Sequence, residues 1–108
     1  MARVLVVNTN TSAAITDLVV RELAAHLPDI AWQPATARFG AAYIATEASY
    51  AIAGHAALDL YARDGAGCDA VLLACFGDPG LFALREIARV PVVGLAEAAM
   101  AEAAAVGR

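Results

Sequence analysis

"DAVLLACFGDPG", residues 69–80, places a run of apolar residues directly before a cluster of residues that turn the chain. A continuous apolar run is typical of a strand that is buried on both faces, so we predict a strand over residues 69–75. Asp78 and Pro79 then match the N-cap and the first position of a helix, which we expect to end near residue 88. This stretch therefore predicts a strand followed by a helix, with Cys75 at the turn between them.

The same alternation of strand and helix continues on both sides of this unit. Further strands are predicted over residues 3–8, 30–37 and 90–95, and further helices over 12–27, 41–64 and 96–108. Pro34 cannot donate to a sheet ladder, so the strand that contains it belongs at an edge. Strands that alternate with helices are parallel and joined by right-handed crossovers. We therefore predict one α/β domain over residues 1–108, an open doubly wound parallel four-stranded sheet with helices on both faces.

The composition excludes several classes of protein. The hydrophobic fraction is 61%, but 29 residues are alanine, which predicts a helix-rich chain with a thin core. The net charge is −4, lysine is absent and the arginines are scattered, which argues against nucleic-acid binding. No apolar stretch has the length to cross a membrane, and the first residues lead into a strand rather than a signal peptide. We expect a cytoplasmic protein.

Two cysteines, Cys68 and Cys75, and two histidines, His26 and His55, are spread along the chain without the spacing of a metal site or a disulfide framework. We therefore expect no metal. At about 3.3 Å per residue, the strand between the cysteines separates them by roughly 23 Å. Cys68 consequently lies at the opposite edge of the sheet from Cys75 and is interpreted as structural.

The expected ligand site lies beyond the carboxyl ends of the strands, where helices begin. This rule selects residues 8–12, 38–40, 75–78 and 94–97. Cys75 stands there before a predicted helix N-terminus, whose partial charge favours a thiolate, although packing alone would also explain a lone cysteine. The polar run "NTNTS" (8–12) is a candidate cradle for a carboxylate or imide oxygen, with ordinary capping and turn formation as the alternative.

Three motifs together resemble a known family. They are "VLVVNTNTSAAIT" near the start, "ACFGDPGLFALRE" around Cys75 and "VPVVGLAEAAM" near the end. In order and spacing they are similar to the first lobe of the aspartate/glutamate/hydantoin racemase superfamily, in its hydantoin and allantoin racemase branch. Thr9 stands where that branch usually has proline. The second lobe of the family, with its own cysteine, is absent from this chain.

The resemblance implies cofactor-independent racemisation of amino-acid derivatives such as 5-substituted hydantoins or allantoin. One thiolate removes the α-proton and a thiol on the opposite face returns one. Cys75 is the implied acid/base, and amides after Cys75 and at residues 10–12 are expected to hold the enolate. The implied substrate-binding residues are Asn8, Asn10, Thr11, Ser12, Phe39, Gly40, Phe76 and Gly77.

The partner thiol must come from outside this chain. We expect a homo-oligomer or association with a second racemase lobe, and two copies could pair so that Cys75 of each faces a shared cleft. Two other functions remain open at this point: a truncated or degenerate lobe that binds a small carboxylate, an imide or a partner without turnover, and a decarboxylase or cis-trans isomerase of small dicarboxylates.

Overall fold

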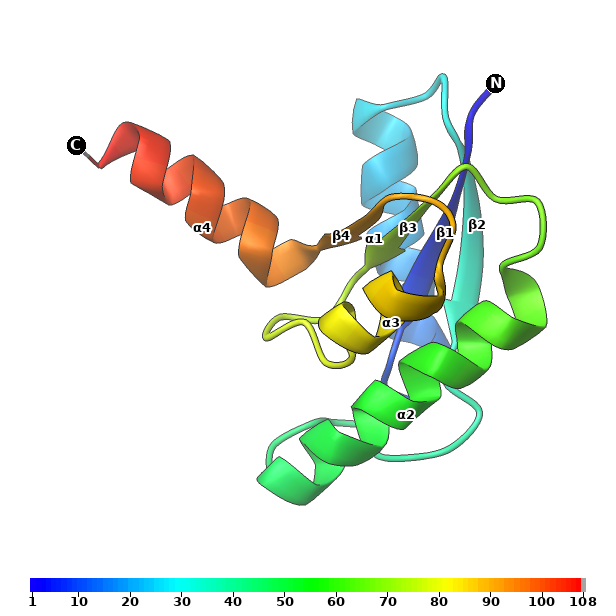
Figure 1. The fold of residues 1–108 in the computed structure, drawn as a ribbon. Coiled ribbons are helices and arrows are strands. Elements are labelled where there is room, and N and C mark those ends of the chain that lie inside the picture. Colours follow the sequence, from blue (N-terminus) through cyan, green and yellow to red (C-terminus); the bar gives the residue numbers. More distant parts are fainter. Residues whose placement is uncertain (108) are drawn as a thin grey trace.

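Strands and helices alternate along the chain in the computed structural model, which describes residues 1–107 (Figure 1). The elements are β1 (Arg3–Asn8), α1 (Ala13–His26), β2 (Ala31–Thr36), α2 (Glu47–Asp64), β3 (Ala70–Leu73), α3 (Leu81–Ile87), β4 (Val92–Gly94) and α4 (Leu95–Val106). All strand pairs are parallel, in the order β2-β1-β3-β4. The predicted α/β fold class is confirmed, and β2, with the exposed Pro34, lies at an edge as expected.

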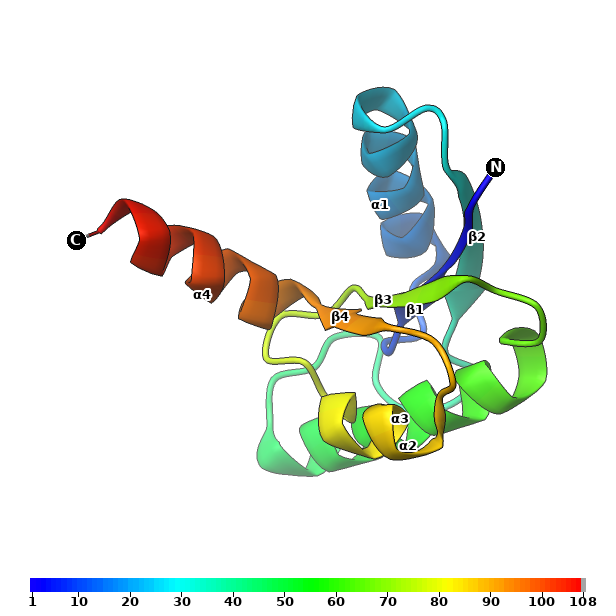
Figure 2. The same cartoon turned by 45° about the horizontal axis from the view of Figure 1, so that its top comes forward.

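The core lies on the face of the sheet that α2 and α3 cover. Apolar side chains of β1 and β3 meet Leu60 of α2 and Leu84 of α3 there, and both leucines are fully buried. Each such leucine stabilises the fold by roughly 1.5–3 kcal/mol. Helix α1 covers the opposite face, beside β1 and β2 (Figure 2). Helices therefore lie on both faces, as predicted.

Helix α4 projects away from the sheet instead of packing along it, as both views show (Figures 1 and 2). Within this helix Ala96 alone is buried, whereas Leu95 and Met100 are 43% and 63% exposed. Its alanine-rich composition offers little side-chain volume with which to fill a core. Among residues 1–107, neither α4 nor any other helix has the length and apolar character needed to cross a membrane.

Two predicted boundaries near the carboxyl edge of the sheet were wrong. Helix α2 begins at Glu47 rather than at residue 41, because the Thr46 hydroxyl accepts from Ser49 N while the Ser49 side chain accepts from Thr46 N in a capping box. Residues 41–46 form a loop instead. Strand β3 ends at Leu73, so Cys75 lies in the loop that follows the strand and not within it.

The predicted N-cap of α3 was also wrong. The helix begins at Leu81 with Gly80 as its N-cap, and Gly80 has a φ of 82°. Asp78 also lies in the left-handed region, with a φ of 54°, and its carboxylate is not used on α3. It accepts hydrogen bonds from the first turn of α4, a partner that local sequence spacing does not indicate.

Candidate active site

The carboxyl ends of the strands meet at one edge of the sheet. The parallel register aligns Asn8 with Thr36, and Leu73 with both Val7 and Gly94. The loops that follow β1, β2 and β3 therefore emerge side by side. The sequence-based prediction that these loops form one edge is confirmed by this register.

Asn8 is a buried residue whose side chain supports the loop after β1. It is 1% exposed, and its Nδ2 donates to Thr16 Oγ1 at 2.9 Å, to Asn10 Oδ1 at 3.0 Å and to the Ser12 carbonyl at 3.1 Å. Its Oδ1 accepts from Asn10 N at 3.2 Å. Because both ends of this carboxamide are bonded within the loop, Asn8 determines the loop's shape. Direct contact between Asn8 and a substrate stays a prediction.

The backbone amides of residues 10–12 are already bonded. Asn10 N donates to Asn8 Oδ1, Ser12 N donates to Asn10 Oδ1 at 2.9 Å, and Thr11 N donates to the Ala41 carbonyl at 3.0 Å. The expectation that these amides hold a developing oxyanion was therefore wrong for this conformation. The groups that remain for a ligand are Asn10 Nδ2 and the hydroxyls of Thr11 and Ser12.

The loop after β2 lies against the loop after β1. Besides the Thr11–Ala41 bond, Ala37 N donates to the Asn8 carbonyl at 2.9 Å. Phe39 is half-buried, and its ring meets the His55 ring edge-on, with centroids 5.0 Å apart. Gly40 has a φ of 104°, which favours glycine at this turn. The structure thus brings the predicted residues of these two loops together.

Arg38, at the start of the loop after β2, is bonded to helix α2. Its guanidinium donates to both carboxylate oxygens of Asp59 on α2. This hydrogen-bonded pairing lowers the pKa of Asp59 and raises that of Arg38. Arg38 therefore anchors the loop to α2.

Cys75 is half-buried in the loop after β3. Its carbonyl accepts from Asp78 N at 3.0 Å, which closes a tight turn, and its Sγ lies 3.9 Å from the Phe76 carbonyl. Among residues 1–107, the N–H groups of Phe76 and Gly77 have no hydrogen-bond acceptor. Two free amide donors therefore directly follow the thiol. Cys68, by contrast, is 6% exposed and belongs to the core.

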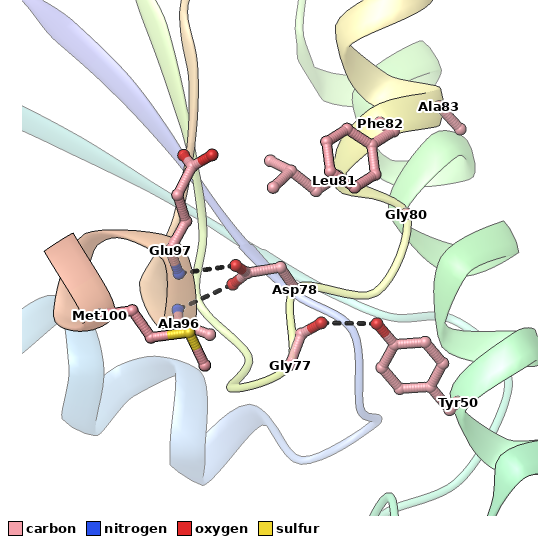
Figure 3. Close-up of a pocket in the computed structure, with 10 residues that line it drawn as sticks. All are labelled: Tyr50, Gly77, Asp78, Gly80, Leu81, Phe82, Ala83, Ala96, Glu97 and Met100. Atoms are coloured by element: carbon pink, nitrogen blue, oxygen red, sulfur yellow. Dashed lines mark hydrogen bonds between the residues drawn. The ribbon is translucent and has the colours of Figure 1, made fainter.

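Two hollows border the loop that carries Cys75. One, of about 460 Å³, is lined by residues 44–47, Tyr50, Phe76 and Gly77. The other, of about 560 Å³, is largely apolar and lies between α3 and α4, with Phe82 on one side and Met100 on the other (Figure 3). Cys75 lines neither hollow, whereas its neighbours Phe76 and Gly77 line the first one.

Sequence reasoning missed Tyr50, which borders both hollows. Its hydroxyl donates to the Gly77 carbonyl at 2.5 Å across a separation of 27 residues. Tyr50 lies within the helix predicted over residues 41–64, and that prediction assigned no role to its side chain. No local pattern indicated its partner. Within the described residues, no cluster of three or more histidine, cysteine or acidic side chains is arranged to hold a metal ion.

Comparison with known proteins shows which family this chain is similar to. The sequence model of the family described as Asp/Glu/Hydantoin racemase matches residues 4–108. A hydantoin racemase of Rhizobium meliloti is 50% identical over 42 residues, which is 39% of this chain and 17% of the relative. A hydantoin racemase of Paenarthrobacter aurescens is 62% identical over 32 residues, 30% of this chain and 14% of the relative.

Two solved structures share the fold over nearly the whole chain. Allantoin racemase from Klebsiella pneumoniae is 39% identical to this chain, with a TM-score of 0.88. The match covers 96% of this chain and 43% of the Klebsiella chain. Allantoin racemase from Pseudomonas fluorescens is 34% identical, also with a TM-score of 0.88, covering 94% of this chain and 43% of its own. The chain therefore spans less than half the length of the structures that it matches.

Proposed function

The chain belongs to the Asp/Glu/hydantoin racemase family, and from this membership we propose that it supplies one half of a cofactor-independent racemase of amino-acid derivatives such as 5-substituted hydantoins or allantoin. One observation carries the proposal: a half-buried thiol, Cys75, follows the central strand β3 at the carboxyl edge of the sheet. The names of the relatives support the substrate class.

In this mechanism Cys75 acts on the carbon next to a carbonyl. As thiolate it takes the α-proton, and the electron pair of the broken C–H bond moves into the carbonyl as an enolate. A thiol on the opposite face then gives its proton to the same carbon. The two sulfurs have exchanged protonation states when the product leaves, and exchange with solvent resets them.

The enolate needs donors close to Cys75. We assign this role to the N–H groups of Phe76 and Gly77, which have no acceptor among residues 1–107. Preorganised amides that face a developing oxyanion contribute about 3–4 kcal/mol each in well-studied enzymes. Asn10 Nδ2 and the hydroxyls of Thr11 and Ser12 orient the rest of the ring from the neighbouring loop.

Cys68 does not supply the second thiol, because it is buried in the core. A second lobe or a second copy of the chain supplies it. The apolar hollow between α3 and α4 supports such pairing, since Phe82 and Met100 on its sides are 76% and 63% exposed. Paired copies would each contribute Cys75 to one shared cleft.

The test is the loss of circular dichroism from enantiopure 5-substituted hydantoins and allantoin over a series of protein concentrations. We expect turnover that rises faster than linearly with concentration, vanishes in Cys75→Ala and persists in the matched variant Cys68→Ala. Turnover unaffected by Cys75→Ala would refute the mechanism. A folded chain without turnover at any concentration would refute catalysis by identical copies of this chain.

A second function has one observation in its favour. The chain spans 43% of the length of the solved racemases, so a lobe that binds a small imide or carboxylate without turnover is the competing proposal. Calorimetric titration with allantoin separates the two. Binding by a protein that leaves the dichroism of allantoin unchanged would establish the second function.

A further inference from the structure

The loop that carries Cys75 has an unusual backbone. Gly77, Asp78 and Gly80 have φ values of 97°, 54° and 82°. Glycine adopts such angles freely, but a residue with a Cβ does so at a cost, which aspartate and asparagine tolerate best. Asp78 is the one residue other than glycine with a positive φ in the described part of the chain. Asp78 is therefore the residue of this loop at which the backbone conformation carries a cost.

The Asp78 carboxylate is bonded to the first turn of α4. Its Oδ1 accepts from Ala96 N at 2.9 Å and its Oδ2 from Glu97 N at 2.8 Å, across 18 and 19 residues of sequence (Figure 3). The N-cap residue of α4 is Gly94, which offers no side-chain cap. Asp78 supplies the cap instead, and its negative charge suits a helix N-terminus.

The space around this contact is fitted to the carboxylate. A Cβ built on Gly94 would lie 2.4 Å from Asp78 Cγ, closer than real atoms approach. A glycine is therefore required at the end of β4 for the Asp78 side chain to reach α4. From the other side, the Tyr50 hydroxyl binds the Gly77 carbonyl. The loop is thus held at two neighbouring residues by two different helices.

Helix α4 has few other attachments to the body. Ala96 is its buried residue, and Arg85 of α3 pairs with Glu97 through both carboxylate oxygens. The orientation of the helix therefore depends on its first turn, where the bonds from Asp78 lie. A change in the position of α4 reaches the Cys75 loop through the same two bonds.

We propose that Asp78 is a positioning residue that clamps the Cys75 loop to the first turn of α4 and thereby sets the position of the Cys75 sulfur. This role deepens the proposed function, since it rests on Cys75 as the acid/base. The bond from Asp78 N to the Cys75 carbonyl completes the connection, because it ties the clamped residue to the cysteine through one tight turn.

Alkylation of the two cysteines by iodoacetamide tests the clamp without requiring turnover. The variant is Asp78→Asn, which keeps the side-chain size and the tolerance for positive φ but loses one acceptor and the charge. Cys68 in the same molecule reports unfolding, because it is buried in the core. When these two charge-assisted bonds are disturbed, we expect the ratio of the Cys75 to the Cys68 alkylation rate to rise about tenfold. The pH dependence of the Cys75 alkylation rate should also change.

Glu97→Gln is the matched control, since it weakens the Arg85 pair on the same turn of α4 but leaves the Asp78 bonds in place. Its alkylation ratio should stay within about twofold of the wild-type value, because exposed ion pairs contribute little. An unchanged ratio in Asp78→Asn, with faster exchange of the Ala96 and Glu97 amides, would overturn the proposal and leave Asp78 as a cap of α4 alone.

If Asp78→Asn does not fold, native-state hydrogen exchange on the wild-type protein tests the proposal instead. The amides of Asp78, Ala96 and Glu97 should open together, with protection factors that agree within about threefold. Protection factors that differ by more would overturn the clamp. Since neither experiment measures racemisation, a failure of the proposed function and a failure of the clamp give different results.

Discussion

Replacing Asn8 by aspartate tests the loop after β1 with almost no change in shape. The Nδ2 group of Asn8 donates to Asn10 Oδ1, the Ser12 carbonyl and Thr16 Oγ1, all between 2.9 and 3.1 Å. Asn8→Asp places a second oxygen among these acceptors, at a residue that is 1% exposed. An uncompensated buried charge costs about 3–5 kcal/mol, a large part of the roughly 5–15 kcal/mol that stabilises a domain of this size.

The loss of stability caused by Asn8→Asp should depend on pH, in a direction that follows from the burial of the new carboxyl. Desolvation and the surrounding oxygens raise the pKa of the new carboxyl above its unfolded value of about 3.9. A raised folded-state pKa means that the carboxyl is tolerated while protonated and becomes destabilising as the pH rises through that pKa. The difference in unfolding free energy between Asn8→Asp and wild type should therefore shrink as the pH falls from 7 to 4.

Urea unfolding followed by far-ultraviolet circular dichroism at several pH values measures this difference. Asn10→Asp is the control two residues away. Asn10 is half-exposed, and its Oδ1 accepts from Asn8 Nδ2 and Ser12 N, bonds that a carboxylate keeps. Its cost should stay within about 1 kcal/mol, because a negative charge near the start of α1 is favourable. Equal costs for the two variants at pH 7 would refute the assignment of Asn8 as the buried support.

Three further outcomes are expected. Gly94→Ala should lower the free energy of unfolding in urea by about 2 kcal/mol or more, because the alanine Cβ would lie 2.4 Å from Asp78 Cγ. An unchanged free energy of unfolding would contradict the close contact between residue 94 and that carboxylate. Thr9→Val should stabilise the fold by about 1 kcal/mol in thermal unfolding, since Thr9 Oγ1 is buried without an acceptor or donor among residues 1–107; a loss of stability would show a partner for the hydroxyl. The carboxyl of Glu97 should titrate by NMR below the usual glutamate range, because the Arg85 hydrogen bond lowers its pKa, so the stability from this pair is present at neutral pH and lost as acid protonates Glu97. Arg85→Met should return that titration toward the usual range, and an unchanged titration would show that the pair does not form in solution.

The strands were predictable because their signal is local. Apolar runs identified the regions of β1, β3 and β4, and Pro34 identified β2 as the edge strand, since a proline cannot donate to a ladder. Ser12 lies at the start of the predicted helix 12–27, and its hydroxyl accepts from Ile15 N as the N-cap of α1. These features depend on residues a few positions apart, where side-chain type and backbone preference are directly coupled.

The start of α2 was not predictable from hydrophobic spacing. Alanines and isolated apolar residues continue the helical pattern back to residue 41, but the capping box at Thr46 and Ser49 ends it. Residues 41–46 are used instead to close the loop over "NTNTS", through the bond from Thr11 to Ala41. The cap at Thr46 thus outweighed the helical spacing that continues back to residue 41.

By itself, the sequence determined the α/β alternation, the edge position of β2 and the place of Cys75 near the carboxyl end of a buried strand. Tertiary structure alone decided that Asp78 binds the first turn of α4, that Tyr50 binds Gly77 and that the Thr11 amide binds the Ala41 carbonyl. The reason is physical. Periodicity and capping act within one or two turns of chain, whereas these bonds join groups that only the packing of the sheet and helices brings within reach.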